Sequence, residues 1–251
     1  MSEASQSFSK RRHQPEQQAP PVQRLRLRYA KRGPARFTSH RDFSRAFERA
    51  LRRADVPMAY SSGFTPHPRI SYANASPTSA ATEAEYLEIG LSEVCDPEKV
   101  RAALDDVLPP GLSVLAVAEA EGQALADRLT ASAWRVDLGE GVDAEVLASA
   151  VAALEAADSF EVSRMTKNGL RTFDVRSAVV QLEVVDGGRL HLLSRHQTPL
   201  VRPDDVVSAL RQLRPELGSA RPALLTRLEQ GSLTDDGGLI DPFTGASLHP
   251  W

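Results

Sequence analysis

The order in which two kinds of hydrophobic periodicity follow one another constrains the fold of this chain most strongly. Residues 22–29 alternate apolar with arginine or polar side chains, which is typical of a half-buried strand. Residues 40–54 place apolar side chains at helical spacing, directly after Ser39 as an N-cap. Four elements follow: strands at 70–75 and 85–91, a helix at 97–107 and a strand at 112–118. The resulting β-α-β-β-α-β order is the ferredoxin-like motif.

A related order recurs in the second half of the chain. Its expected elements are strands at 133–138, 160–165, 172–185, 189–195 and 223–228 and helices at 142–156 and 204–213. Asp186-Gly187-Gly188 is a strong hairpin signal between two of these strands. The pattern is either β-α-β-β-β-α-β or the same motif with one long strand bent in two. We therefore predict an α+β protein of two tandem ferredoxin-like domains.

Composition sets the boundaries of these domains. Residues 1–21 are rich in Ser, Gln and Pro, and residues 231–251 are rich in Gly and Asp, so both are expected to be flexible tails. Within the second tail, Phe243 and Trp251 could pack back onto the protein. The predicted domains are a basic one at residues 22–121 and an acidic one at residues 132–230.

The cysteine and hydropathy content excludes several classes of protein. Cys95 is the single cysteine, which excludes an intrachain disulfide framework, a zinc knuckle and a cysteine-ligated iron–sulfur cluster. The sequence has no apolar stretch of about 18 residues and no secretory signal. These features predict a cytoplasmic protein without a membrane span, a cofactor or a metal site.

The net charge of −3 conceals an uneven distribution. Residues 1–70 hold 15 Lys or Arg against 5 Asp or Glu, whereas residues 71–251 hold 15 against 28. Residues 22–53 contain eleven basic side chains against only Asp42 and Glu48, and helical spacing places Arg41, Arg45 and Arg49 on one line. Guanidinium groups bind phosphates and stack on bases, so this excess favours RNA as a partner. An acidic protein surface, including this chain's own second half, is the alternative.

Two further features suggest contact residues. The loop after the first helix carries Gly63 and three prolines and presents Phe64, His67 and Arg69, which could stack on a base and bind a phosphate. A structural loop with Phe64 in the core is the competing interpretation. His40 and His67 could instead act as the general base and acid of a metal-independent ribonuclease.

Two stretches carry a resemblance to a known family: Arg36-Phe37-Thr38-Ser39-His40-Arg41-Asp42 and Tyr60-Ser61-Ser62-Gly63-Phe64-Thr65-Pro66-His67-Pro68-Arg69. The chain resembles the radical-SAM-associated domain family of unknown function, in its stand-alone actinobacterial type without the radical-SAM enzyme domain. Stand-alone relatives are encoded near a ribonuclease of the E/G type and ribosomal proteins, which implies a role in RNA metabolism. Because the three-cysteine cluster motif of the fused enzymes is missing, the resemblance implies that any radical chemistry belongs to a partner in trans.

These observations together predict a non-enzymatic RNA-binding adaptor for RNA processing, modification or ribosome-related metabolism. Its expected partners are ribosomal or transfer RNA, with an E/G-type ribonuclease or a radical-SAM enzyme. The expected RNA-binding residues are Arg36, His40, Arg41, Arg45, Arg49, Phe64, His67 and Arg69. Two alternatives stay open: an endoribonuclease that uses His40 and His67, and a protein-interaction module without RNA affinity.

Overall fold

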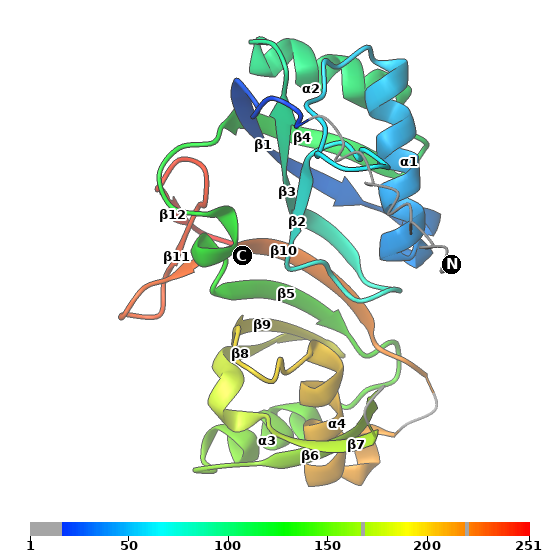
Figure 1. The fold of residues 1–251 in the computed structure, drawn as a ribbon. Coiled ribbons are helices and arrows are strands. Elements are labelled where there is room, and N and C mark those ends of the chain that lie inside the picture. The colour runs from blue at the N-terminus through cyan, green and yellow to red at the C-terminus, as the bar shows by residue number, and fades with distance from the viewer. Residues whose placement is uncertain (1–16, 167–168, 219–220) are drawn as a thin grey trace, which may run out of the picture.

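A computed structural model describes residues 17–166, 169–218 and 221–251 (Figure 1). The strands are β1 (Gln23–Lys31), β2 (Ile70–Ala73), β3 (Ala81–Leu91), β4 (Leu112–Glu119), β5 (Ala131–Asp137), β6 (Glu161–Thr166), β7 (Gly169–Asp174), β8 (Val179–Asp186), β9 (Arg189–Arg195), β10 (Leu224–Leu233), β11 (Leu239–Ile240) and β12 (Ser247–Leu248). The α-helices are α1 (His40–Arg53), α2 (Pro97–Val107), α3 (Ala144–Glu155) and α4 (Pro203–Leu213). Short 3-10 helices are η1 (Gly33–Phe37), η2 (Leu125–Arg128), η3 (Arg176–Ala178) and η4 (Pro215–Leu217).

One large, mostly antiparallel sheet runs through both halves of the chain. Its order in the described residues is β4-β1-β3-β10-β5-β9-β8, with β2 also paired to β3. The first half therefore has the order β4-β1-β3-β2, and the second half has the matching order β10-β5-β9-β8. The two halves meet where β10 pairs in parallel with the start of β3, Ala81 with Thr226 and Thr82 with Arg227. The protein is thus α+β, and its sheet continues across the boundary expected between two domains.

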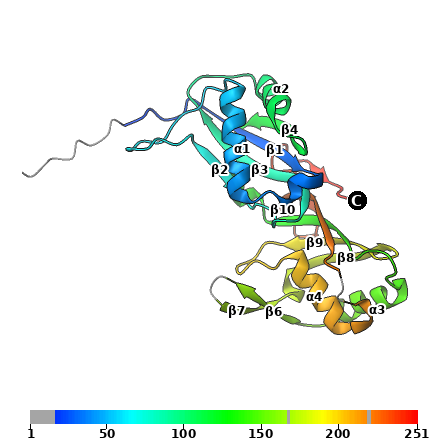
Figure 2. The ribbon, with the colours of Figure 1, turned by 90° about the vertical axis from the view of Figure 1, so that its right-hand side faces the viewer.

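Two hydrophobic cores lie under two pairs of helices (Figure 2). The apolar stripe expected in the first helix is buried: Phe43, Phe47 and Leu51 of α1 pack on Leu25 and Leu27 of β1, together with β3, β4 and α2. The second core joins α3 and α4 to β5, β8 and β9. The predicted alternation of apolar side chains and arginines along β1 is therefore confirmed. The apolar side chains face α1, and the arginines face the other side of the sheet.

The expected long strand at 172–185 is divided. β7 ends at Asp174, η3 follows, and β8 starts at Val179, while β6 and β7 form a separate two-stranded sheet. Among the described residues no helix combines the length and apolar content needed to cross a bilayer.

The C-terminal segment 231–251 is not the structureless tail that its composition suggests. β10 continues to Leu233, and β11 and β12 extend the sheet beside it. Phe243 packs edge-to-face on Tyr86 with 5.4 Å between ring centroids, and Trp251 stacks on His191 at 4.8 Å. Burial of apolar and aromatic side chains therefore offsets the conformational entropy that this Gly-rich segment loses when it becomes ordered. Of the expected N-terminal tail, residues 1–16 lie outside the described residues, and residues 17–20 are exposed without regular structure.

Candidate functional site

The arginines of β1 are occupied by contacts within the protein. Arg26 is buried and pairs with Glu88 at 3.3 Å, and it also donates to the carbonyl of Glu121 at 2.9 Å. Arg28 pairs with Glu229 of β10 at 2.9 Å. Arg24 pairs with Glu88, and Arg32, the residue after β1, pairs with Glu83. Much of the basic excess seen in the sequence is thus neutralised by acidic residues from β3 and β10.

The arginines of α1 differ from those of β1. Arg41, Arg45 and Arg49 are exposed, and none of them makes an ion pair or hydrogen bond with a residue that the structure describes. We call these three the α1 arginine row. The neighbouring Arg52, by contrast, forms an ordinary i,i+4 ion pair with Glu48 at 3.4 Å. The row presents three positive charges without a protein counter-charge of their own.

Two exposed aromatic side chains lie in the segments before and after α1 in the chain, Phe37 in η1 and Phe64 in the following loop. Phe64 is 78% exposed, so it does not plug the core as the alternative interpretation of the loop proposed. Phe37, which the sequence reasoning missed, is 62% exposed, and the Arg36 guanidinium lies 4.9 Å from its ring centroid. The sequence did carry a signal for Phe37, because it is an aromatic residue that lies between Arg36 and Arg41 just before the predicted helix.

His40 and His67 line different hollows. His67 and Arg69 lie in a hollow of about 320 Å³ with Pro21, Arg24 and Glu88. His40, the first residue of α1, lies in a cleft of about 610 Å³ between the two halves of the chain. The structure therefore does not unite the two imidazoles in one hollow, as an acid–base pair requires.

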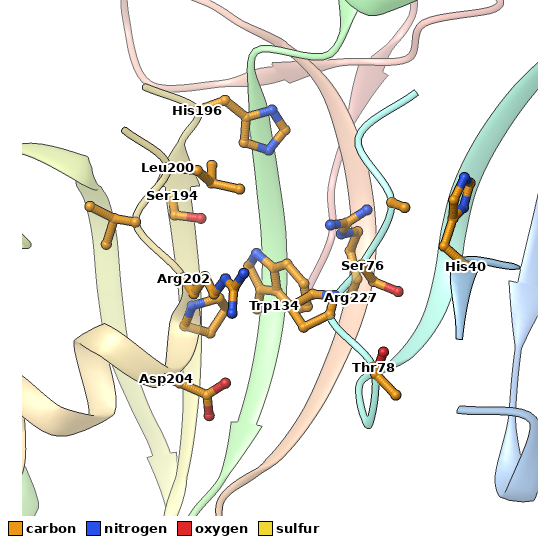
Figure 3. A pocket seen from close by; sticks show the side chains of 14 residues that line it. His40, Ser76, Thr78, Trp134, Ser194, His196, Leu200, Arg202, Asp204 and Arg227 are labelled. Carbon is orange, nitrogen blue, oxygen red and sulfur yellow. The ribbon is translucent and has the colours of Figure 1, made fainter. Parts of the chain in front are cut away.

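The cleft between the halves gathers side chains from both halves of the chain (Figure 3). One wall comes from the start of α1 and from residues 75–78, and the other comes from residues 200–204 at the start of α4. Trp134 of β5, Ser194 of β9 and Arg227 of β10 lie between these walls. Of the residues expected from the sequence to bind RNA, only His40 lines this cleft, which the sequence did not predict because it forms where the two halves of the sheet meet.

Arg227 is the charged residue buried deepest in this cleft, at 4% exposure. Its guanidinium lies 4.7 Å from the ring centroid of Trp134. Its Nη1 donates to the carbonyl of Asn74 at 2.7 Å and to Glu85 at 3.2 Å. Glu85 also accepts from the backbone N–H of Ser76 at 3.1 Å. A buried ion pair thus ties β10 to β3 beneath the cleft.

His196 closes one side of the cleft as a neutral imidazole. Its Nδ1 lies 2.7 Å from the carbonyl of Leu129, which can only accept, so Nδ1 carries the proton. Its Nε2 then accepts from the hydroxyl of Ser132 at 2.8 Å. Burial lowers the pKa of His196 to about 4. Among the described residues no group of three or more His, Cys, Asp or Glu side chains is arranged to hold a metal ion.

A family comparison covers most of the chain. Residues 24–203 match the family described as "Uncharacterized protein conserved in bacteria (DUF2344)". The chain belongs to this family. Resemblance to a family of unknown function is thereby confirmed, whereas the link of DUF2344 to radical-SAM enzymes stays a prediction. Among curated proteins no match was found.

Similarity to solved structures is low. A chain of a Cbf5-Nop10-Gar1 complex aligns with 8% identity and a TM-score of 0.42, covering 88% of this chain and 56% of that one. This chain therefore spans little more than half the length of that relative. The first two RRM domains of the yeast poly(U) binding protein Pub1 align with 12% identity and a TM-score of 0.20, covering 81% and 98%. At sequence identities and TM-scores this low, neither similarity supports a conclusion about function.

Proposed function

We propose that this DUF2344 protein is a non-enzymatic RNA-binding accessory protein that holds RNA along α1. The observation that carries the proposal is the α1 arginine row, whose three side chains lack acidic partners in the described residues while those of β1 have them. Consecutive members lie about 6 Å apart along the helix axis, since each residue of an α-helix adds about 1.5 Å. Such a row neutralises several phosphates of one strand.

The aromatic side chains favour RNA over an acidic protein surface. Phe37 and Phe64 are exposed, the Arg36 guanidinium lies over the Phe37 ring, and exposed aromatic rings are platforms on which unpaired bases stack. The binding surface on this proposal is the α1 arginine row with Arg36, Phe37 and Phe64. Ribosomal or transfer RNA as the ligand, and an E/G-type ribonuclease or a radical-SAM enzyme as the acting partner, are the proposed extensions of the family resemblance.

The test replaces Arg41, Arg45 and Arg49 together by Ala and measures binding of a dye-labelled single-stranded RNA of random sequence by fluorescence anisotropy over a series of KCl concentrations. Each lost phosphate contact lowers the slope of log K against log [salt] by about 0.7, so the triple variant should lose about 2 from the slope. Affinity at low salt should fall by more than about tenfold.

A charge-matched control separates the row from overall charge. Arg135 of β5 and Arg189 and Arg195 of β9 are exposed residues of the second half of the chain, whose core is separate from that of α1. Replacing these three by Ala changes the net charge equally and should leave the slope within error of the wild type. Equal losses in both triple variants, or an unchanged slope in the first, would show that RNA is not held along α1.

A further inference from the structure

Arg227 has an unfilled hydrogen-bonding edge. Its two contacts, with Asn74 and Glu85, both use Nη1. Neither Nε nor Nη2 donates to any residue that the structure describes, and Nε is fully buried. Unpaired buried donors destabilise a protein, and charged ones do so more, so they are rare without a reason. Nε has no accessible surface, whereas Nη2 is not among the buried unpaired atoms, so Nη2 is the donor that a phosphate or carboxylate oxygen in the cleft can reach.

The surroundings of the Arg227 guanidinium fit a ligand in which a phosphate is attached to a ring. Ser76 also lines the cleft, and its buried hydroxyl likewise lacks a partner among the described residues. Figure 3 shows Ser76, Thr78 and His40 on one wall and Arg202 and Asp204 on the other. Apolar surface comes from Pro77 and Leu200. A cleft of about 610 Å³ is also far larger than an inorganic anion requires.

We propose that this cleft binds one unstacked nucleotide of the bound RNA, with its phosphate on Arg227 and Arg202 and its base against Pro77 and Leu200. The inference rests on the proposed function. It names the subsite that holds the end of the RNA strand bound along α1. His40 supplies the continuity, because it lines the cleft as the first residue of α1 and Arg41, the next residue, begins the arginine row.

Trp134 is a built-in reporter for this site. It lies beneath Arg227, and the other tryptophan, Trp251, is far along the chain and partly exposed on His191. In a Trp251→Phe protein the remaining fluorescence reports the cleft alone. The experiment titrates this protein with AMP, with UMP and with inorganic phosphate, exciting at the red edge of the tryptophan absorption. Both nucleotides should change the Trp134 emission with saturation, and inorganic phosphate should bind at least about tenfold more weakly.

Two substitutions test the contacts. Arg227→Lys keeps the charge but removes the planar guanidinium with its unpaired Nη2, and it should weaken nucleotide binding by about tenfold or more. Because a buried variant can fail to fold, Arg202→Ala, an exposed position, provides a second test and should weaken binding by a similar factor. Arg189→Ala, exposed on β9, is the control and should change nothing.

The outcomes separate this inference from the proposed function. Nucleotide binding that survives replacement of the α1 arginine row, but is lost with Arg202→Ala, supports the inference. Absence of any Trp134 response to AMP and UMP, with salt-dependent RNA binding along α1 intact, overturns the inference and leaves the proposed function standing. Equal affinity for inorganic phosphate and nucleotides also overturns it. An unchanged salt slope in the α1 triple variant, or an equal loss in the control triple variant, overturns the proposed function and with it the assignment of the bound nucleotide to RNA held along α1.

Discussion

Arg28 of β1 and Glu229 of β10, 201 residues apart in the sequence, form an ion pair of 2.9 Å on the face of the sheet opposite α1. Both side chains are about four-fifths buried. Burial raises the pKa of the Glu229 carboxyl, and the hydrogen bond from Arg28 offsets part of that rise. β10 pairs with β3 through only two residue pairs. The ion pair is therefore a main side-chain link between the two halves.

We predict a measurable coupling between these two residues. Arg28→Ala should lower the free energy of unfolding by about 2 kcal/mol, because it leaves a mostly buried carboxylate without its counter-charge. A double-mutant cycle with Glu229→Ala should give a coupling energy of about 1 kcal/mol or more, measured by urea denaturation. The exposed pair Glu48–Arg52 is the control, with an expected coupling of about 0.3–0.5 kcal/mol. Equal coupling in the two cycles would contradict the structural role given to Arg28.

His196 should make stability depend on pH. Burial lowers its pKa from 6.5 to about 4. Between these two pH values His196 is protonated in the unfolded chain but neutral in the folded protein. The stabilisation is complete above pH 6.5 and is lost as the pH falls toward 4, by at most about 3 kcal/mol. His196→Gln should flatten this part of the stability profile. His249→Gln, at an exposed position, should leave the profile as it is in the wild type.

Gly231 should tolerate no side chain. A Cβ at this position of β10 would lie 2.0 Å from the carbonyl oxygen of Ile240 in β11. Gly231→Ala must therefore push β11 away from the sheet, and we expect a loss of about 2 kcal/mol or more in urea denaturation. Gly187, in the hairpin turn, has open space around its Cβ position and an ordinary φ. Gly187→Ala should change stability by less than about 1 kcal/mol.

Ser39 should matter as the cap of the helix that carries the arginine row. Its hydroxyl accepts from the backbone N–H of Asp42 at 3.2 Å and donates to the Asp42 carboxylate at 2.7 Å. Ser39→Ala should cost about 1 kcal/mol, and Ser39→Asp should retain most of the cap. Thermal denaturation of the three proteins gives the comparison. A Ser39→Asp protein no more stable than Ser39→Ala would argue against side-chain capping.

Local patterns in the sequence predicted most of the elements. The sequence predicted the apolar stripe of α1, the cap at Ser39 and the turn at Asp186, because each depends on neighbours within a few residues. The C-terminal strands were not, because Gly- and Asp-rich residues order only when a partner strand such as the end of β10 is already present.

For the candidate site, local periodicity was enough to place Arg41, Arg45 and Arg49 on one exposed line of α1, since a helix sets that spacing whatever packs against it. Which arginines keep their charge available was decided by tertiary structure, because Glu88 and Glu229 reach the β1 arginines only through strand pairing. The same holds for the separation of His40 from His67 and for the cleft around Arg227, which forms where β3 meets a strand that lies over 140 residues later in the chain.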